Sequence, residues 1–152
     1  MEAAELGLRA ALLKDGRALL EKLVQSVADS LSQAQTQKGE KCHADRSRTV
    51  DTIFGAINVE RDYLYSPKEQ QGRCPMDEAL GLIDGTSPGL VRLASRAAAR
   101  EGFEAASDDL KELAGIQVDG RQIQRLVAVS GPTIAAQLKL TGPDVQAKPM
   151  PI

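Results

Sequence analysis

The sequence predicts a mainly helical α+β protein with a long N-terminal helix, a small β-hairpin and a helical bundle that contains a helix-turn-helix. Apolar residues recur three, four or seven apart along most of the chain, as they do on one face of a helix. The period changes to two only within residues 46–66. Aromatic residues are scarce, with two Phe, two Tyr and no Trp. The core must therefore consist mainly of aliphatic side chains packed between helices.

Residues 1–36 are predicted to form an amphipathic helix. Its apolar stripe consists of Leu8, Leu12, Leu19, Leu23, Val27 and Leu31. Gly16 interrupts the pattern at a cost of about 1 kcal/mol relative to Ala, so one long helix and two shorter ones are both open. The stripe can pack on the domain behind it or form a dimerising coiled coil, and the lack of sustained heptads favours the first. Residues 37–45 are polar and without period, which indicates a linker.

Residues 46–66 are predicted to form a β-hairpin. A type II′ turn at residues 55–56 would place glycine at the first central position and would pair Val50 with Arg61. One face is then apolar near the turn. Because a two-stranded hairpin is only marginally stable alone, this face must lie on helices. The stretch SPKEQQGRCP that follows is expected to be a loop.

Residues 67–140 are predicted to form a helical domain. A short helix, PMDEALGLI, comes first. A second helix covers residues 90–100, with Ser87 as its N-cap, Pro88 at the first helical position and Gly102 at its end.

Two further amphipathic helices, residues 103–114 and 120–129, are joined by a tight turn that contains glycine, which is typical of a helix-turn-helix. Asp119 and Gln122 have the spacing of a capping box for the second helix. That helix is expected to stop before Gly131 and Pro132. A short last helix, TIAAQLKL, and a Pro-rich linker over residues 141–152 then complete the chain.

The start of the second helix could read DNA. Early side chains of a recognition helix reach base edges, where Arg pairs with guanine and Gln with adenine. The candidate base-reading residues are Arg121, Gln122, Gln124 and Arg125. The candidate phosphate contacts on the hairpin are Arg46, Arg48 and Arg61. From this pattern alone, the two helices can equally be a plain helical hairpin with a good cap and no role in DNA binding.

The charge balance limits the kind of nucleic-acid binding that is possible. With a formal net charge of −2, the chain lacks the basic field that dominates non-specific binding, so any DNA contact must be local. Arg92, Arg96 and Arg100 recur at intervals of four. Glu101 and Glu104 lie close enough in sequence to pair with them, so we expect a solvated helix face there.

The sequence favours a cytoplasmic protein. No apolar run approaches the roughly 20 residues that cross a bilayer, so no membrane partner is expected. The N-terminus MEAAELGLRA has neither the basic nor the apolar region of a signal peptide. Cys42 and Cys74 are therefore expected to be reduced thiols.

Several motifs occur in a fixed order: RTVDTIFGAINVERDYLY, then PMDEALGL, SPGL, FEAASDDL and the helix-turn-helix. From about Arg46 to about Gln137 the chain resembles the N-terminal region of the ISKra-type insertion-sequence transposases of bacteria. The resemblance implies a role in DNA transposition, in which the protein binds double-stranded DNA at the terminal repeats of its element and is nucleoid-associated when bound. It also implies a following RNase H-like catalytic domain, whose three acidic residues hold two divalent metals.

None of those three acids can be carried over to this chain, which ends at KPMPI, about where the first would be approached. The chain is therefore expected to be truncated before the catalytic domain, inactive alone and without a cofactor of its own. Its other acids do not suit a nuclease site: Asp108 and Asp109 diverge around a helix, and Asp77, Glu78 and Asp84 are placed to cap. The three candidate zinc ligands are Cys42, His43 and Cys74, which cannot readily close a tetrahedral site.

Two function classes follow. The first is the DNA-binding and assembly region of a transposase. The second is a helical protein-interaction module, for dimerisation or regulation, that forms a homo-oligomer through the N-terminal helix and does not bind DNA. A salt-sensitive DNA shift would favour the first, and concentration-dependent association without DNA binding would favour the second.

Overall fold

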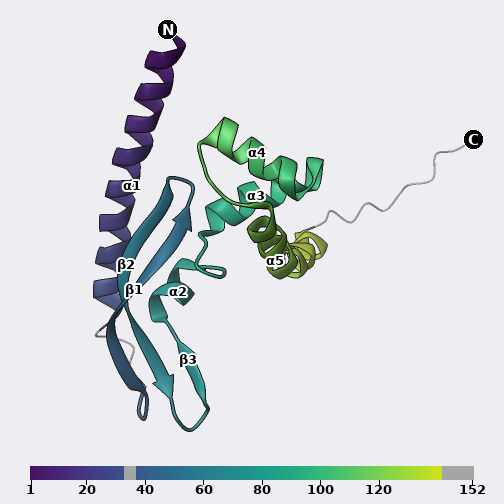
Figure 1. Cartoon of the computed structure of the whole chain (residues 1–152). Coiled ribbons are helices and arrows are strands. Elements are labelled where there is room, and N and C mark those ends of the chain that lie inside the picture. Colours follow the sequence, from purple (N-terminus) through teal and green to yellow (C-terminus); the bar gives the residue numbers. More distant parts are fainter. Residues whose placement is uncertain (33–36, 142–152) are drawn as a thin grey trace, which may run out of the picture.

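The computed structural model describes residues 1–32 and 37–141. Their order is one long helix, three strands and four further helices (Figure 1). The elements are α1 (Glu2–Ser32), β1 (Lys41–Thr52), β2 (Gly55–Ser66), β3 (Gln71–Arg73), α2 (Pro75–Leu80), α3 (Pro88–Glu101), α4 (Phe103–Ala114) and α5 (Gly120–Thr141). The predicted class, mainly helical with a small antiparallel sheet, is confirmed.

The N-terminal helix is single and unbroken at Gly16. The glycine has a packing role, because a Cβ atom there would lie 2.9 Å from ring atoms of Phe54. The aromatic ring at the hairpin tip thus approaches the α1 backbone directly. Of the two alternatives left open by the sequence, the structure has the long helix.

The hairpin turns two residues earlier than the sequence suggested. Thr52 pairs with Gly55 and Val50 with Ile57, so the turn consists of residues 53–54, and the expected pair of Val50 with Arg61 is wrong. The Thr52 hydroxyl fixes this turn: its Oγ1 donates to the Gly55 carbonyl at 2.6 Å and accepts from the Phe54 amide at 3.2 Å. Gly55 then takes a φ of +106°, which favours glycine.

The sheet is also longer and wider than expected. The first strand begins at Lys41, inside the stretch assigned to a linker, and residues 71–73 of the expected loop add a third strand beside β2. The register shifts between His43 and Arg46, where the first strand has an extra residue. Such a bulge reverses which residues face the core. On β2 the alternation of buried residues also changes beyond Arg61, where Leu64 is buried and Tyr63 is exposed.

The hairpin lies on α1, as its one apolar face requires. Ala28 of the helix shares a buried cluster with Val50, Ile57, Val59 and Met76. The opposite face of the sheet is polar and exposed. This packing supplies the helical support that a hairpin alone lacks.

Two side chains of α1 also cover the open edge of β2. Glu21 Oε2 accepts from the Asn58 amide at 3.0 Å, and Gln25 Oε1 accepts from the Glu60 amide at 2.9 Å. Gln25 Nε2 donates back to the Glu60 carbonyl at 2.9 Å. Unpaired edge groups would otherwise be a template for another strand. The helix therefore both buries the sheet and closes its edge.

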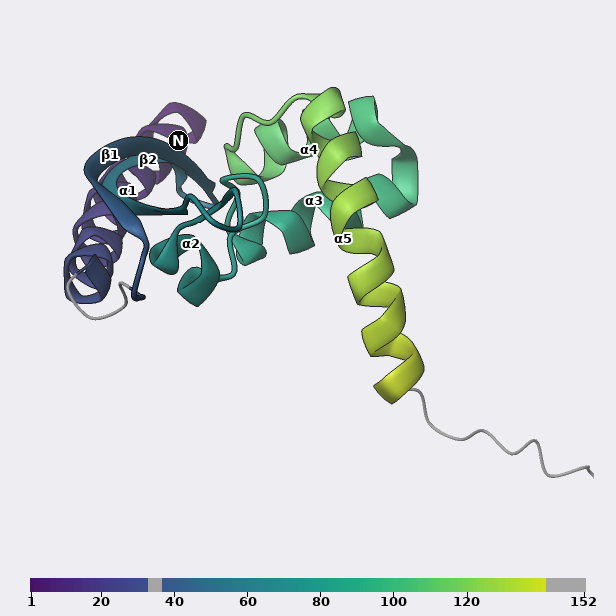
Figure 2. The same ribbon diagram turned by 90° about the horizontal axis from the view of Figure 1, so that it is seen from below.

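The last three helices form a second core around Leu90, Ala94, Leu110 and Ile123. Seen from below, they form one group, α1 and the hairpin form another, and α2 lies between (Figure 2). The predicted N-cap Ser87 is confirmed, since its side chain accepts from the Leu90 amide.

The last helix does not stop where the sequence suggested. It continues from Gly120 to Thr141 through Gly131 and Pro132, so the expected break and separate final helix are wrong. Proline inside a helix removes one amide donor and crowds the carbonyl four residues earlier, yet α5 continues past it (Figure 2). Of the expected Pro-rich linker, residues 142–152 lie outside the described residues.

Candidate nucleic-acid interface

The turn between α4 and α5 is built by short-range hydrogen bonds. Gly115 ends α4 in the left-handed region with φ +68°, and the Ile116 amide donates to the Leu110 carbonyl at 3.0 Å. Ser107 Oγ donates to the Val118 carbonyl at 2.6 Å. Asp119 Oδ1 accepts from the Gln122 amide at 2.7 Å and caps α5. The two helices and their turn therefore have the connectivity expected of a helix-turn-helix.

The first turns of α5 are clearly two-sided. Ile123 and Leu126 are buried in the helical domain. Arg121, Gln124 and Arg125 are exposed on the opposite side. One face of the helix is thus available for base or phosphate contacts.

Gln122 does not belong to that exposed set. Its Nε2 donates to Asp51 Oδ2 at 2.8 Å, so the side chain ties the start of α5 to β1. The backbone amide of Gln122 is thus bound by the Asp119 cap, while its side-chain nitrogen is bound by β1. Asp51 also bonds the loop before α3, since its amide donates to the Gly85 carbonyl and its carbonyl accepts from Ser87. The hairpin and the helical group are joined at Asp51.

The N-terminus of α5 already has negative groups beside it. Asp119 is the cap, and a Cβ atom on Gly120 would lie 2.4 Å from Glu104 Oε1. Carboxylates at a helix N-terminus satisfy its positive end and oppose a phosphate there. The helix end is therefore not an open phosphate site, and the exposed face of α5 remains the candidate.

The three hairpin arginines have different surroundings. Arg46 is exposed. The guanidinium of Arg48 lies against the α2–α3 loop. A Cβ atom added to Gly85 would lie 2.8 Å from Arg48 Nη2. Arg61 is 8% exposed, its Nε lies 3.0 Å from Asp77 Oδ1, and its Nη1 contacts Cys74 Sγ. The expectation that Arg61 contacts phosphate is corrected, because its charge is buried and paired.

A second basic row lies on α3 and is a solvated helix face, as expected. Arg92, Arg96 and Arg100 are all exposed along α3. Within the described part of the chain, none of them forms an ion pair, so the expected pairing with Glu101 and Glu104 is wrong. Their spacing of four was the visible signal. Only the structure shows that Glu104 points instead to α5.

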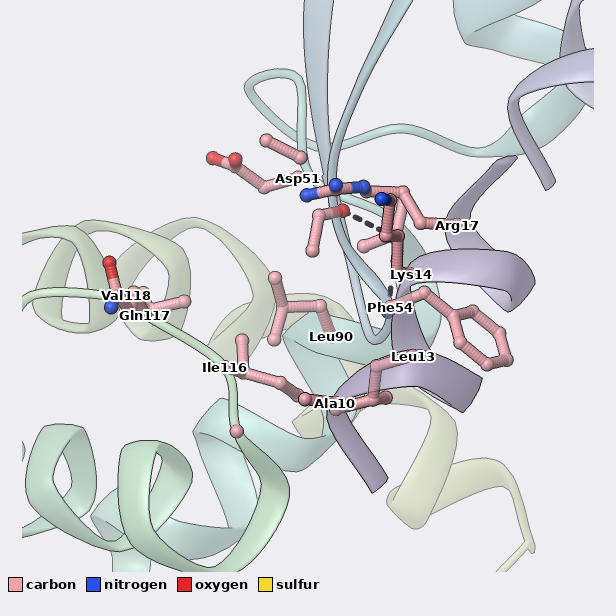
Figure 3. Close-up of a pocket in the computed structure, with 14 residues that line it drawn as sticks. Ala10, Leu13, Lys14, Arg17, Asp51, Phe54, Leu90, Ile116, Gln117 and Val118 are labelled. Atoms are coloured by element: carbon pink, nitrogen blue, oxygen red, sulfur yellow. Dashed lines mark hydrogen bonds between the residues drawn. The ribbon is translucent and has the colours of Figure 1, made fainter. Parts of the chain in front are cut away.

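A cleft of about 540 Å³ lies between α1, the hairpin tip and the α4–α5 turn (Figure 3). Leu13, Leu90 and Ile116 line one end, while Lys14, Arg17 and Asp51 lie toward the other. Nearby, the Arg9 guanidinium donates to the Glu112 and Leu113 carbonyls at the end of α4. The charged groups in the cleft are a lysine, an arginine and a carboxylate that is already bound by Gln122. This combination does not indicate any one class of ligand. We interpret the cleft as the seam between α1 and the helix-turn-helix.

The three candidate zinc ligands do not form a metal site among the described residues. Cys42 is exposed and Cys74 is buried. Burial raises the pKa of the Cys74 thiol, and the positive charge of Arg61 partly offsets this. Among the described residues, no group of three or more His, Cys, Asp or Glu side chains is arranged to hold a metal ion.

No helix of residues 1–32 and 37–141 is long and apolar enough to cross a membrane. None of the curated proteins matches the chain. The model of one family, described as the uncharacterised protein family UPF0236, matches residues 1–148. This match covers nearly all of the sequence, and the chain therefore belongs to the UPF0236 family.

Proposed function

We propose that the chain is a DNA-binding and assembly region of an ISKra-type transposase and binds the ends of its element. The observation that carries the proposal is the exposed row of Arg121, Gln124 and Arg125 on α5, directly after a tightly built turn. Arg and Gln in this position match the donor and acceptor patterns of guanine and adenine in the major groove.

The geometry also refines which residues take part. Gln122 binds Asp51, and Arg61 binds Asp77, so both act within the fold. Arg48 lies against the α2–α3 loop, which leaves Arg46 as the exposed phosphate candidate on the hairpin. Base reading would come from α5, while phosphate contacts would set its register on the duplex.

The test is binding of the full chain to fluorescent DNA carrying the terminal repeat of its own element, against shuffled DNA, measured by anisotropy at two salt concentrations. Arg121→Ala should weaken binding to the repeat by about 1–3 kcal/mol and binding to shuffled DNA much less, because it removes one base contact. Lys22→Ala, at an exposed position on α1, is the matched control and should bind as the unaltered chain does. Equal affinity of the unaltered chain for both DNAs would contradict the proposal.

A second candidate function, self-association through α1, has its own support. Four leucines of the predicted stripe, Leu8, Leu12, Leu19 and Leu23, are 62–69% exposed. The expectation that this stripe packs on the domain behind it is therefore wrong for them, and other residues of α1 contact the sheet. Their spacing of four, seven and four is symmetric, so an antiparallel second copy would set Leu8 against Leu23 and Leu12 against Leu19. Large apolar side chains exposed in one row along a helix are a candidate interaction site.

Sedimentation velocity over a range of concentrations tests self-association without DNA. The double variant Leu12→Glu/Leu19→Glu should remain monomeric where the unaltered chain associates. Val129→Glu is the control, since Val129 is 60% exposed on α5, in the helical group. Association that persists in the double variant, or a chain that is monomeric throughout, would refute this second candidate.

A further inference from the structure

The surface of the helical group is divided by charge. Its middle helix, α4, has four acidic residues and one lysine: Glu104, Asp108, Asp109, Glu112 and Lys111. The helix before it, α3, has three arginines and one glutamate: Arg92, Arg96, Arg100 and Glu101. The two helices pack on the same core, so a polyanion that approaches this group meets repulsion at α4 and attraction at α3.

This division conflicts with the usual docking of a helix-turn-helix. In the common geometry, the helix that precedes the recognition helix crosses the DNA backbone. That helix is α4 here, and Glu104, Asp108 and Glu112 are exposed on it. Carboxylates held near phosphates would oppose such a contact. Another element must supply most of the backbone contacts if α5 enters the groove.

We propose that α3 supplies them, with Arg92, Arg96 and Arg100 lying along the phosphates of one DNA strand. This inference rests on the proposed DNA binding by α5 and names the surface that holds the backbone. All three guanidinium groups are exposed, and none is engaged by a carboxylate within the described part of the chain. They are therefore available to an external anion without breaking an existing pair.

The dimensions of the row suit this partner. Residues four apart on one helix face are about 6 Å apart along the axis, so the row spans about 12 Å. One strand of B-DNA presents a phosphate every 3.4 Å of its axis, or three to four over that length. Arginine also binds phosphate through two parallel hydrogen bonds, which favours a backbone contact over a diffuse attraction. The row faces outward because Leu90, Val91 and Ala94 hold the other side of α3 in the core.

The salt dependence of DNA binding distinguishes direct contacts from general charge. Log affinity falls as log salt rises, and the magnitude of this slope decreases by about 0.9 for each phosphate contact that is lost. The triple variant Arg92→Ala/Arg96→Ala/Arg100→Ala should therefore lower the slope by about 2.7. Alanine is the best helix former, so α3 should remain intact, and far-UV circular dichroism checks this. Each single variant should lower the slope by about 0.9, which keeps the test informative if the triple variant loses structure.

A matched control removes the same charge elsewhere. Lys22→Ala/Lys38→Ala/Lys68→Ala also deletes three exposed cations, none of them in the helical group, and it should leave the slope within about one unit of the unaltered chain. An unchanged slope in the arginine variants, with DNA binding retained, would overturn the role of α3 and leave the proposed function standing. If the unaltered chain binds neither DNA, both the inference and the proposed function fail.

Discussion

Removal of the Asp77 carboxylate should strongly destabilise the fold, because Arg61 would be left charged in a buried position. Arg61 Nε lies 3.0 Å from Asp77 Oδ1, and the two side chains are 7% and 25% exposed. The contact is an ion pair, because among the described residues neither Arg61 Nε nor Asp77 Oδ1 has a hydrogen-bond partner. Asp77→Ala therefore deletes the one carboxylate that compensates this guanidinium.

The expected loss is about 3 kcal/mol of unfolding free energy, the low end of the range for breaking a buried pair. The low end applies because Asp77 is partly exposed, so water can enter and solvate Arg61 in part. The double variant Arg61→Met/Asp77→Leu should recover to within about 1 kcal/mol of the unaltered protein, since replacing a whole buried pair with apolar side chains is often neutral. This recovery separates an orphaned charge from a simple loss of contacts.

The assay is urea unfolding followed by far-UV circular dichroism on the unaltered chain, the two variants and Asp108→Ala. Asp108 is exposed on α4, so that control should change stability by less than about 0.5 kcal/mol. If Asp77→Ala costs less than about 1 kcal/mol, Arg61 reaches solvent without its partner. Arg61 would then be free to reach an external anion and would return as a phosphate candidate.

Three further predictions use local features. Asp119→Ala should cost about 1 kcal/mol in urea unfolding through loss of the α5 cap, and no change in stability would refute the capping role. A thiol reagent at pH 8 should label Cys42 promptly and Cys74 only after unfolding, because burial raises the Cys74 pKa and leaves little reactive thiolate; labelling of both at similar rates would contradict this. The hydrogen bond from Arg73 lowers the Glu40 pKa below 4.5, so its contribution to stability is present above that pH and is lost as pH falls through the lowered value. In the Glu40→Gln variant, the urea unfolding midpoint should decrease less as the pH is lowered. A midpoint with the same pH dependence as that of the unaltered chain would count against the Glu40–Arg73 pair.

Local signals in the sequence predicted the ends of several elements well. Ser87 caps α3, Gly102 ends it, Gly115 ends α4 and Asp119 caps α5, each as expected. These features depend on hydrogen bonds between residues only a few positions apart. The helix-turn-helix connectivity could therefore be predicted before any tertiary contact was known.

Features that depend on distant partners could not be predicted in this way. Glycine at position 55 suited the predicted turn, but the Thr52 hydroxyl and the packing of Phe54 on Gly16 favour a turn at residues 53–54. Gln122 had the chemistry of a base reader, and its actual partner, Asp51, lies 71 positions earlier in the chain. A pattern of residue types contains no information on which of two compatible partners a side chain reaches.

By itself, the sequence determined the class of the protein: helical periods, a single stretch of period two, and caps that set where most helices begin and end. Only the tertiary structure decided which charged side chains remain available to a partner. Arg46 and Arg61 are cross-strand neighbours, yet one is exposed and the other is buried against Asp77. The physical reason is that secondary structure follows from short-range sterics and hydrogen bonds, whereas the availability of a charge depends on which groups the whole fold brings within a few ångströms of it.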